Sequence, residues 1–332
     1  MGDTAFVGNV RTEPSRELSF KEDYELIDSF GRRVTYLRVS ITDRCNLRCW
    51  YCMPSHCKWL PREEVLAYEE LLRVVAVGAS LGISKVRLTG GEPLVRKGLP
   101  WLISKIVETP GVEEVALTTN GTLLARQVTD LKSSGLNRVN ISIDTLDSER
   151  YESITRGGRL SDVIVGIDAA VAAGFRCVKL NSVLQRDADI ADVYSLVEFA
   201  RARRVRLRFI ELMPLANEVR GGARYDSSFI SAREVKARLE GVDTGHVEFI
   251  SPVSQPFCDT CNRLRLTPDG KLLACLCRGG AVDIKAIVRD NRCGGHHRRL
   301  AQAFHRCLGL KPEPWRAWGG TARLERVSAI GG

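Results

Sequence analysis

The pattern of hydrophobic and polar positions divides the chain, from residue 34 onward, into strand-like runs that alternate with helix-like segments. The pattern predicts strands over 34–41, 85–89, 114–118, 138–144, 178–183 and 205–212, and helices over 63–81, 99–107, 123–134, 148–155, 162–173 and 191–203. Strands that alternate with helices of this length are typical of parallel β/α units. Six such units predict an α/β fold built as an incomplete TIM-type barrel, short of the eight units of a full one.

Inside most of these strands, polar residues occupy one face and apolar residues the other, whereas parallel strands buried on both faces normally read as continuous hydrophobic runs. We expect the apolar face to pack under the helices and the polar face to line a wet, positively charged interior. Buried cations need partners, and ligand anions such as a polyphosphate would supply them. A solvent-facing edge is the alternative for some positions. The polar set is Arg38 and Ser40; Lys85, Arg87 and Thr89; Asn140, Ser142 and Asp144; Lys179 and Asn181; and Arg206 and Arg208.

Composition and charge narrow the choice of partners only a little. Of the 332 residues, 44% are hydrophobic and 27% are charged, which is an ordinary globular composition. The net charge of +9 favours phosphates or nucleic acid without choosing between them, and an ordinary basic protein would carry it too. A metal-ribbon protein that binds nucleic acid is the alternative from another class, but aromatic residues are only 7% and the cations are expected to point inward.

The cysteine count and the first residues indicate a compartment. Residues 1–30 carry scattered acids and bases without an apolar centre, so we expect no signal peptide. The longest apolar run, near 71–83, is too short to span a membrane. Eleven cysteines, an odd number, fit a closed disulfide framework poorly. We therefore expect a cytoplasmic protein without a membrane or nucleic-acid partner, in which the cysteines serve as metal ligands.

Three cysteines stand within eight residues directly after the first predicted strand, as Cys45-x₃-Cys49-x₂-Cys52. A loop this tight can bring three thiolates onto one inorganic centre but leaves no cysteine for a fourth position, and Cys57 lies outside the set beyond Pro54. Iron–sulfur clusters are usually held by four thiolates, so three predict a [4Fe–4S] cluster with one iron open to a ligand. A cysteine-rich loop or an incomplete zinc site is the alternative.

Two further loops follow strands at the rim where barrel active sites lie. Gly90-Gly91-Glu92-Pro93 follows the second strand, and its glycines let a ligand approach the backbone closely, although a simple tight turn is as good an explanation. Thr118-Thr119-Asn120-Gly121 ends the third strand. Together with the cysteine loop, they predict a site at this rim.

The C-terminal third carries a second set of three cysteines, Cys258-x₂-Cys261-x₁₃-Cys275, with Cys277 two residues further on. A Pro-Asp-Gly turn at 268–270 predicts a hairpin that folds Cys275 back towards the pair. Zinc is the alternative, but a zinc ribbon would have a second C-x₂-C in place of this C-x-C. Cys277 could compete with Cys275 as the third ligand.

Two arginines, Arg263 and Arg265, alternate on the strand that follows Cys261, so their side chains share a face. They predict a second cationic patch, beside the second cysteine set. The other segments carry weaker signals. Residues 1–33 read as a partly ordered arm, and a helix is expected near 232–239.

The last part of the chain shows no clear periodicity. Residues 290–320 look irregular, and we interpret them as a solvated basic loop, with metal binding by His296, His297 and Cys293 as the alternative. The chain ends in Gly331-Gly332, a tail small enough to enter a narrow site.

These motifs together resemble the GTP 3′,8-cyclases, radical S-adenosylmethionine enzymes that open molybdenum cofactor biosynthesis. The match covers about residues 34–290 and the last few. It rests on Arg-Val-Ser-Ile-Thr-Asp-Arg-Cys at 38–45, Tyr-Cys-Met-Pro at 51–54, Lys-Val-Arg-Leu-Thr-Gly-Gly-Glu-Pro at 85–93, Arg-Phe-Ile-Glu-Leu-Met at 208–213, Phe-Cys-x-x-Cys-Asn-Arg-Leu-Arg at 257–265 and the final Gly-Gly.

The resemblance implies an N-terminal arm over 1–33, a radical S-adenosylmethionine partial barrel over 34–215, and a C-terminal domain over 216–332 that carries a second iron–sulfur cluster and the Gly-Gly tail. It implies two [4Fe–4S] clusters, each with one open iron. The implied ligands are Cys45, Cys49 and Cys52 for the first cluster and Cys258, Cys261 and Cys275 for the second, and the implied catalytic residues are the first three cysteines with Arg263, Arg265, Gly331 and Gly332.

The resemblance also implies where the small molecules bind. S-adenosylmethionine would bind the open iron of the first cluster, with contacts from Tyr51, Gly91, Ser142 and Met213. The guanine of GTP would meet the open iron of the second cluster, and the cations would take mainly the triphosphate. The implied GTP contacts are Arg38, Lys85, Arg87, Thr118, Lys179, Arg208, Arg263, Leu264 and Arg265.

The implied reaction converts GTP to (8S)-3′,8-cyclo-7,8-dihydroguanosine 5′-triphosphate. One-electron reduction of S-adenosylmethionine gives a 5′-deoxyadenosyl radical, which takes the ribose 3′ hydrogen, and the C3′ radical then adds to guanine C8. The protein positions the reacting atoms and excludes water. The implied partners are GTP, an electron donor of flavodoxin or ferredoxin type and the downstream cyclic pyranopterin monophosphate synthase, with the chain itself a monomer or homodimer.

The chain departs from the family pattern in two places. The segment 240–257 is shorter than usual, which leaves the strands of the C-terminal domain open, and 290–320 has few family features. A radical enzyme that modifies peptides is the nearest alternative. Such enzymes usually carry more cysteines in the C-terminal region, and they do not need a triphosphate-binding interior.

Overall fold

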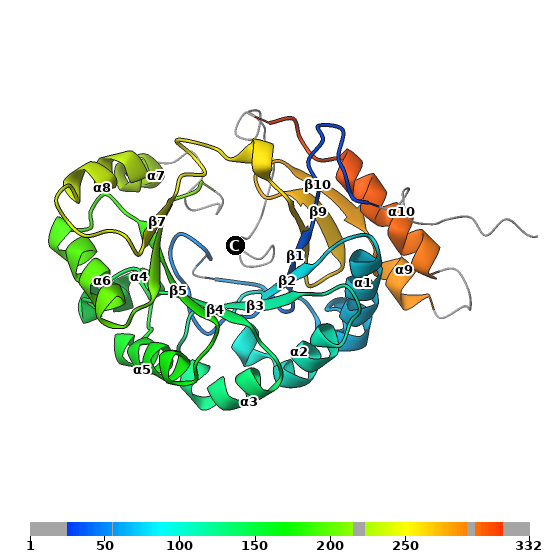
Figure 1. Cartoon of the computed structure of the whole chain (residues 1–332), viewed down its shortest axis with the longest axis horizontal. Coiled ribbons are helices and arrows are strands. Elements are labelled where there is room, and N and C mark those ends of the chain that lie inside the picture. Colours follow the sequence, from blue (N-terminus) through cyan, green and yellow to red (C-terminus); the bar gives the residue numbers. More distant parts are fainter. Residues whose placement is uncertain (1–24, 55, 215–222, 291–295, 315–332) are drawn as a thin grey trace, which may run out of the picture.

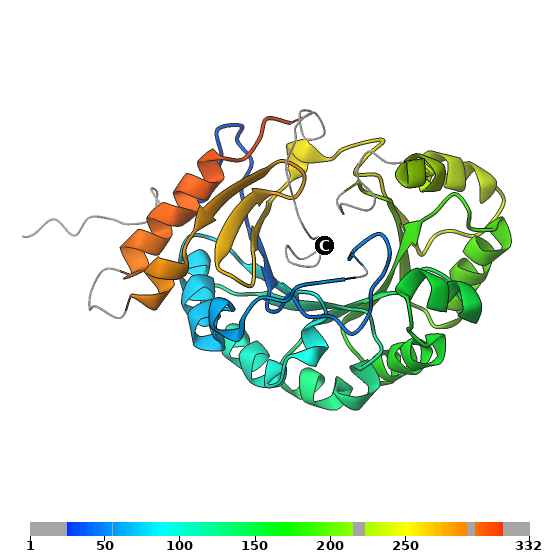
Figure 2. The same cartoon turned by 180° about the vertical axis from the view of Figure 1, so that it is seen from behind.

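The sheet of this protein bends into an open barrel, with helices on its outer side (Figures 1 and 2). The computed structural model describes residues 25–54, 56–214, 223–290 and 296–314. Over these ranges ten strands form one sheet in the order β10-β9-β8-β1-β2-β3-β4-β5-β6-β7. They are β1 (Tyr36–Ser40), β2 (Lys85–Thr89), β3 (Glu114–Thr119), β4 (Arg138–Ser142), β5 (Cys177–Leu184), β6 (Arg206–Glu211), β7 (Val247–Ile250), β8 (Arg263–Leu266), β9 (Lys271–Cys275) and β10 (Gly279–Asp283).

Neighbouring strands from β1 to β7 are parallel, and β8 is parallel to β1 on the other side. Only β9 and β10 run antiparallel to their neighbours. Because β10 and β7 are the two ends of the strand order, the barrel stays open between them. The predicted α/β class and incomplete barrel are confirmed.

The helices follow the strands as parallel β/α connections require. They are α1 (Tyr68–Ser80), α2 (Leu99–Val107), α3 (Val128–Ser133), α4 (Ser148–Thr155), α5 (Leu160–Ala172), α6 (Ile190–Ala202), α7 (Ala223–Ser228), α8 (Ala232–Arg238), α9 (Lys285–Arg289) and α10 (His296–Gly309), with short 3₁₀ turns η1 (Arg62–Glu64), η2 (Pro93–Val95), η3 (Leu124–Arg126) and η4 (Cys258–Thr260).

The apolar residues of each strand form the core between the sheet and these helices. Leu37, Val39, Val86 and Leu88 of β1 and β2 are fully buried, and the corresponding residues of the other parallel strands join the same cluster. The predicted direction of the apolar face is therefore confirmed. None of the helices in the described ranges is long and apolar enough to cross a membrane.

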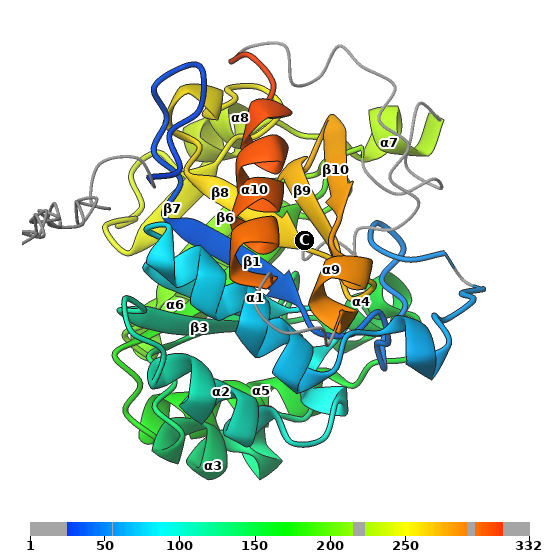
Figure 3. The same ribbon diagram turned by 90° about the vertical axis from the view of Figure 1, so that its right-hand side faces the viewer.

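The prediction for 290–320 is wrong, because the described part of it contains the 14-residue helix α10. Its apolar residues fall at helical spacing, and Leu300, Phe304 and Cys307 are buried. The many Arg and His residues on the other face hide that period in the sequence. α10 packs beside α1 and over the strands β9 and β10 (Figure 3), with Phe304 against Gly78.

Three other expectations need adjustment. β7 adds a seventh parallel strand within the shortened segment 240–257. The helix expected over 63–81 is interrupted, because Leu66 is buried and its N–H donates to Pro268 O of the C-terminal hairpin turn. The helix expected over 123–134 is divided into η3 and α3. Within the predicted arm, residues 25–33 form a turn closed by the bridge between Ile27 and Arg33.

Candidate active site with two three-cysteine sets

Cys45, Cys49 and Cys52, called here the first cysteine set, lie on the loop that follows β1. The loop folds tightly, since the N–H of Cys52 donates to Cys49 O at 2.9 Å. It is fastened to the end of α4, because Arg48 N donates to Thr155 O at 2.9 Å and Trp50 N donates to Ile154 O at 3.1 Å.

The thiols of the first set sit in a low-dielectric environment that favours the neutral form. Burial raises the pKa of Cys45 to about 11 and that of Cys52 to about 12, with Glu92 and the neighbouring thiols adding to it. Burial raises the pKa of Cys49 well above its usual range, and Cys52 and Asp144 contribute. A metal centre would therefore have to displace the protons when it binds. Cys57 stays outside the set, with its Sγ donating to Pro54 O at 3.2 Å.

The Gly90-Gly91 motif lets the second strand end directly against the cysteine loop. Gly91 N donates to Thr42 O at 2.8 Å, and Glu92 N donates to Arg44 O at 2.8 Å. A Cβ on Gly91 would lie 2.2 Å from Arg44 O, so a side chain here would push the loop away. In this structure the glycines allow the backbone of the cysteine loop, and not a ligand, to come close to the end of β2.

Glu92 is the buried anchor of this rim. Its carboxylate accepts hydrogen bonds from Thr119 Oγ1 at 2.7 Å, Asn120 N at 2.7 Å and Leu94 N at 3.0 Å. Asn120 in turn directs Nδ2 towards Cys45 Sγ at 3.9 Å. Burial raises the pKa of Glu92 to about 7, although these hydrogen bonds oppose the shift. Glu92 thus ties the ends of β2 and β3 to the first cysteine set.

Tyr51, between Cys49 and Cys52, reaches across to the end of β4. Its hydroxyl donates to Asp144 Oδ2 at 2.6 Å, and Asp144 Oδ1 accepts from Val183 N at 2.8 Å. Burial raises the pKa of Asp144 to about 6. The Tyr51 hydroxyl therefore makes a hydrogen bond to a buried carboxyl group in this structure.

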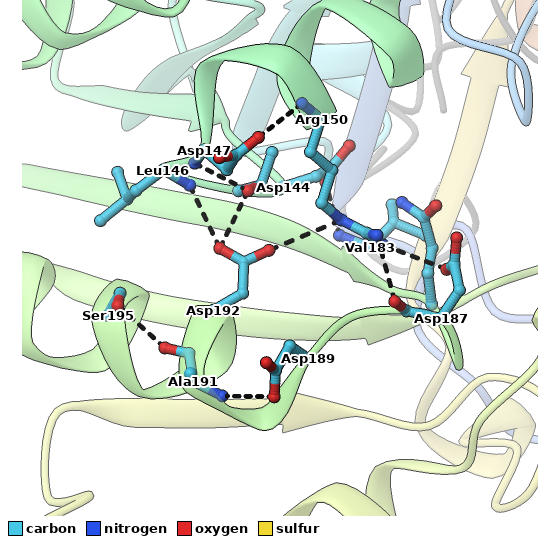
Figure 4. A network of polar contacts seen from close by, with 12 residues as sticks. Asp144, Leu146, Asp147, Arg150, Val183, Asp187, Asp189, Ala191, Asp192 and Ser195 are labelled. Carbon is cyan, nitrogen blue, oxygen red and sulfur yellow. Dashed lines mark hydrogen bonds and ion pairs between the residues drawn. The ribbon is translucent and has the colours of Figure 1, made fainter.

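A network of charges holds the surroundings of Asp144 in place (Figure 4). Arg150 of α4 contacts Asp187 at 3.0 Å and Asp192 at 3.5 Å, and Asp192 accepts from Leu146 N at 3.3 Å. Because α4 also carries the cysteine loop, this network connects the loop to the ends of β4 and β5.

Cys258, Cys261 and Cys275, called here the second cysteine set, lie on η4 and at the end of β9. Cys261 N donates to Cys258 O at 3.2 Å, and β8 and β9 pair as the predicted hairpin. Cys275 Sγ accepts from Cys277 N at 3.4 Å. Hydrogen bonds from the Cys277 thiol and from backbone N–H groups lower the pKa of Cys275, whereas the pKa of Cys277 is raised by the same pairing.

The strand pairing lines up three arginines on the inner face of the sheet. Arg38 of β1 stands in register with Arg265 of β8 on one side and with Arg87 of β2 on the other. Burial, together with the neighbouring arginines, lowers the pKa of Arg265 to about 10 and that of Arg38 well below its usual value. Three like charges in one partly buried row favour the binding of an anion.

Two arginines of β2 and β8, Arg87 and Arg263, have donors that could also bind a ligand. Arg87 Nη1 approaches Thr118 Oγ1 at 3.4 Å, and Arg263 lies over the Phe257 ring at 4.9 Å. Among the described residues, Nε of Arg87 and Nε of Arg263 have no hydrogen-bond partner. These donors are free to bind a ligand oxygen.

For Lys179 and Arg208, which were expected to have a ligand anion as counter-ion, the structure shows a carboxylate of the protein itself as a partner. Glu248 of β7 meets Lys179 Nζ at 2.9 Å, Arg208 Nη2 at 2.6 Å and Arg206 Nη1 at 3.1 Å. These contacts outweigh the effect of burial and lower the pKa of Glu248 to about 2. Sequence reasoning missed Glu248 because it lies in a segment where no strand was predicted.

The remaining described residues expected in the site lie on or directly after several different strands. Lys85 starts β2, next to Tyr36 in register, and Ser142 ends β4. Leu264 is fully buried in the apolar core, so only its backbone could meet GTP. Met213 follows β6. Gly331 and Gly332 lie outside the described residues.

Two family models match the chain. The radical SAM superfamily covers residues 39–200, and the model described as "Molybdenum Cofactor Synthesis C" covers residues 231–317. The "GTP 3',8-cyclase 2" of Pseudomonas aeruginosa is 40% identical over 312 residues, which are 88% of this chain and 93% of that protein. The "GTP 3',8-cyclase" of Moorella thermoacetica is 42% identical over 328 residues, 92% and 99% of the two chains. The chain belongs to the GTP 3′,8-cyclase family.

Solved structures with low sequence identity share the fold of this GTP 3′,8-cyclase family member. Streptococcus suis SuiB with its precursor peptide SuiA superposes with a TM-score of 0.63 at 14% identity, covering 86% of this chain and 66% of that one. Native anSMEcpe with bound AdoMet superposes with a TM-score of 0.56 at 16% identity, covering 77% and 80%.

The family uses two [4Fe–4S] clusters and S-adenosylmethionine, and the residues present fit these groups. Each set offers three free cysteines, and N–H groups of Leu47 and Cys277 donate to the sulfurs of Cys45 and Cys275, as is usual around iron–sulfur clusters. In the described ranges no three His, Cys, Asp or Glu side chains are arranged to hold a single metal ion.

Sequence reasoning missed three other residues that shape the site. Glu92 appeared only as part of a motif, although it anchors the rim. Arg32 and Lys311 both contact the second cysteine set but come from segments without a recognisable signal. Neither Arg32, next to another arginine, nor Lys311, before a proline, has a sequence context that hints at such a contact.

Proposed function

We propose that the protein is a GTP 3′,8-cyclase that converts GTP to (8S)-3′,8-cyclo-7,8-dihydroguanosine 5′-triphosphate, the first step of molybdenum cofactor biosynthesis. The observation that carries the proposal is the row of Arg265, Arg38 and Arg87 on strands that adjoin both cysteine sets. A triphosphate is the anion that best satisfies three adjacent guanidinium groups.

In this proposal the first cysteine set holds the cluster at which S-adenosylmethionine binds, and together they supply the one-electron chemistry that starts the reaction. Tyr51, Gly91, Ser142 and Met213 would hold the cosubstrate. Tyr51 is suited to position the loop, since its hydroxyl is already anchored on Asp144. The residues around the loop would keep water away and hold the cosubstrate in one orientation.

GTP would lie across the inner face, with its guanine at the second cysteine set. Arg263 and Arg265 would be catalytic as well as binding residues, because β8 places them directly after Cys261 and Arg265 belongs to the arginine row. Lys179 and Arg208 would have to share their charge between GTP and Glu248. The proposed GTP contacts are Arg38, Lys85, Arg87, Thr118, Lys179, Arg208, Arg263, Leu264 and Arg265, with Gly331 and Gly332 supporting the radical step.

The division of the chain and its partners form the rest of the proposal. An arm at 1–33, a barrel at 34–215 and a C-terminal domain at 216–332 would act together, and the pairing of β8 with β1 supports a shared site. The proposed partners are a flavodoxin- or ferredoxin-type electron donor and the downstream cyclic pyranopterin monophosphate synthase. The protein would act in the cytoplasm as a monomer or homodimer.

The test is anaerobic reconstitution followed by incubation with reductant, S-adenosylmethionine and GTP. We expect about eight iron atoms per chain, four for each cluster, together with 5′-deoxyadenosine and a cyclised GTP product. If neither product forms in a fully reconstituted sample, the proposed function is wrong. If 5′-deoxyadenosine forms and GTP stays unchanged, the protein would instead be a radical enzyme that acts on another substrate.

A further inference from the structure

Lys311 follows α10 and places its ammonium group between the two strands that carry the second cysteine set. The residue is only 5% exposed. Its Nζ donates to Arg263 O at 3.0 Å, to Ala274 O at 3.4 Å and to Cys261 Sγ at 3.4 Å. The three contacts use the three donors of the ammonium group.

Burial of this lysine requires an explanation, because a buried charge without a compensating partner is costly. The two carbonyl oxygens carry only partial charge. The third partner is the sulfur of Cys261, one of the three ligands of the proposed cluster, and a cluster held by thiolates carries the negative charge that would compensate the ammonium group. An apolar side chain of similar length would fill the same space without this cost, so space filling alone does not account for a lysine here.

Arg32 holds the same region from the other end of the chain. Its Nη1 donates to Cys258 O at 3.0 Å, and its Nη2 donates to Pro312 O, next to Lys311, at 2.7 Å. Asp28 pairs with Arg32 Nε at 2.5 Å, and both side chains are almost fully buried. Arg32 therefore joins the first segment of the second cysteine set to the backbone that carries Lys311.

We propose that Lys311 is a positioning residue that raises the reduction potential of the cluster on the second set through its hydrogen bond to the Cys261 sulfur, with Arg32 holding it in place. The proposal rests on the proposed function, because it assumes that cluster. A cluster gains one negative charge on reduction, and a fixed cation that hydrogen-bonds a ligand sulfur stabilises the reduced state more than the oxidised one. Hydrogen bonds to the sulfurs and net charge are known to set such potentials.

The experiment isolates the second cluster in the full-length chain. Cys45, Cys49 and Cys52 are changed to Ala, and Lys311→Gln, Lys311→Met and Lys311→Arg are introduced in that background. Iron content after reconstitution and the midpoint potential by redox titration with electron paramagnetic resonance are measured. Lys132→Met is the matched control, since Lys132 also donates to a backbone carbonyl but lies on α3, in the outer layer.

We expect Lys311→Gln to lower the equilibrium constant for reduction about tenfold, a shift of about 59 mV to more negative potential for one electron. Lys311→Met should shift the potential at least as far and retain less iron. Lys311→Arg should recover most of the shift because it restores the charge, and Lys132→Met should change nothing.

Unchanged potential and iron content in Lys311→Gln would overturn the inference, whether or not Lys311→Met assembles a cluster. A shift in Lys311→Gln that Lys311→Arg does not recover would also overturn it, since geometry and not charge would then be responsible. If the background chain with Lys311 intact takes up no iron, the two-cluster proposal falls together with this inference. A cluster that forms but does not respond to Lys311 leaves the proposed function standing.

Discussion

The two cysteine sets have the same number of ligands but opposite electrostatic surroundings. Burial raises the pKa values of the thiols in the first set, and the nearby acids Glu92 and Asp144 add to the shift. In the second set, the pKa of Cys261 is lowered against burial by Lys311 and Arg263, and Lys311 contributes to the lower pKa of Cys275 after the hydrogen bonds that this thiol accepts. Potentials of iron–sulfur clusters follow local charge.

The two clusters are therefore suited to different tasks. Acidic surroundings disfavour an extra electron, so a cluster on the first set would be the stronger reductant. Cationic surroundings favour both thiolate ligands and an anionic substrate, so the second set is suited to hold and orient GTP.

Removing one ligand from each set should separate the two tasks most clearly. We expect Cys49→Ala and Cys261→Ala each to lower the iron content from about eight to about four atoms per chain. Cys49→Ala should abolish 5′-deoxyadenosine formation. Cys261→Ala should still form it, without cyclised GTP. Iron analysis and chromatography of the products measure this, and loss of all iron in either variant would contradict the comparison.

The arginine row should matter for GTP and not for the first cluster. Arg265→Ala removes charge-assisted hydrogen bonds worth about 1.5–3 kcal/mol, so GTP should bind about 10–100-fold more weakly. Equilibrium binding of GTP to the reconstituted enzyme measures it, and spectra of the first cluster should not change. Arg203→Ala, whose partner Asp168 is on the outer surface, is the matched control. Equal GTP affinity in Arg265→Ala and Arg203→Ala would remove Arg265 from the site.

Glu92 should make the first rim sensitive to pH. The fold raises the pKa of Glu92 from 4.5 to about 7, so the folded state favours the protonated side chain. The contribution of Glu92 to the free energy of unfolding is therefore complete below pH 4.5 and is lost as the pH rises through 7. Ionisation should lower the free energy of unfolding by about 3 kcal/mol over this window. Anaerobic unfolding curves at several pH values measure it. In Glu92→Gln this part of the pH dependence should disappear, and parallel profiles for the two proteins would argue against the role.

The hydrogen bond of Tyr51 should have the smallest effect. Tyr51→Phe removes one donor to Asp144 and should lower the free energy of unfolding by about 1 kcal/mol, without loss of iron. The pKa of Asp144 should rise further, because the Tyr51 hydroxyl lowers it in the native protein. Anaerobic denaturant unfolding and iron analysis test this. Loss of the first cluster in Tyr51→Phe would show that the residue does more than position the loop.

Much of the fold could be predicted because its signals are local. The polar and apolar alternation in 85–89 reflects the two faces of one strand, and the predicted bounds match β2. Both cysteine sets are also local, apart from the hairpin that brings Cys275 back. The helix α10 and the strand β7 were missed because basic residues dominate one and only four residues form the other.

The partners of the charged residues could not be predicted in the same way. Lys179 finds Glu248 across two neighbouring strand pairs, and Arg32 meets Cys258 from 226 residues away. Such pairs depend on which strands lie side by side in the sheet. The spacing of apolar residues predicts the strands but not their order in the sheet. An isolated Lys311 before a proline would look like any surface residue.

The sequence by itself determined the β/α order, the apolar face of each strand and two three-cysteine motifs, because each depends on residues close together in the chain. Only the tertiary structure decided that Arg265, Arg38 and Arg87 form one row, since β8 returns to pair with β1. It also decided the charge around each cysteine set. That charge comes from side chains far apart in sequence, and packing alone brings them to the same sulfur atoms.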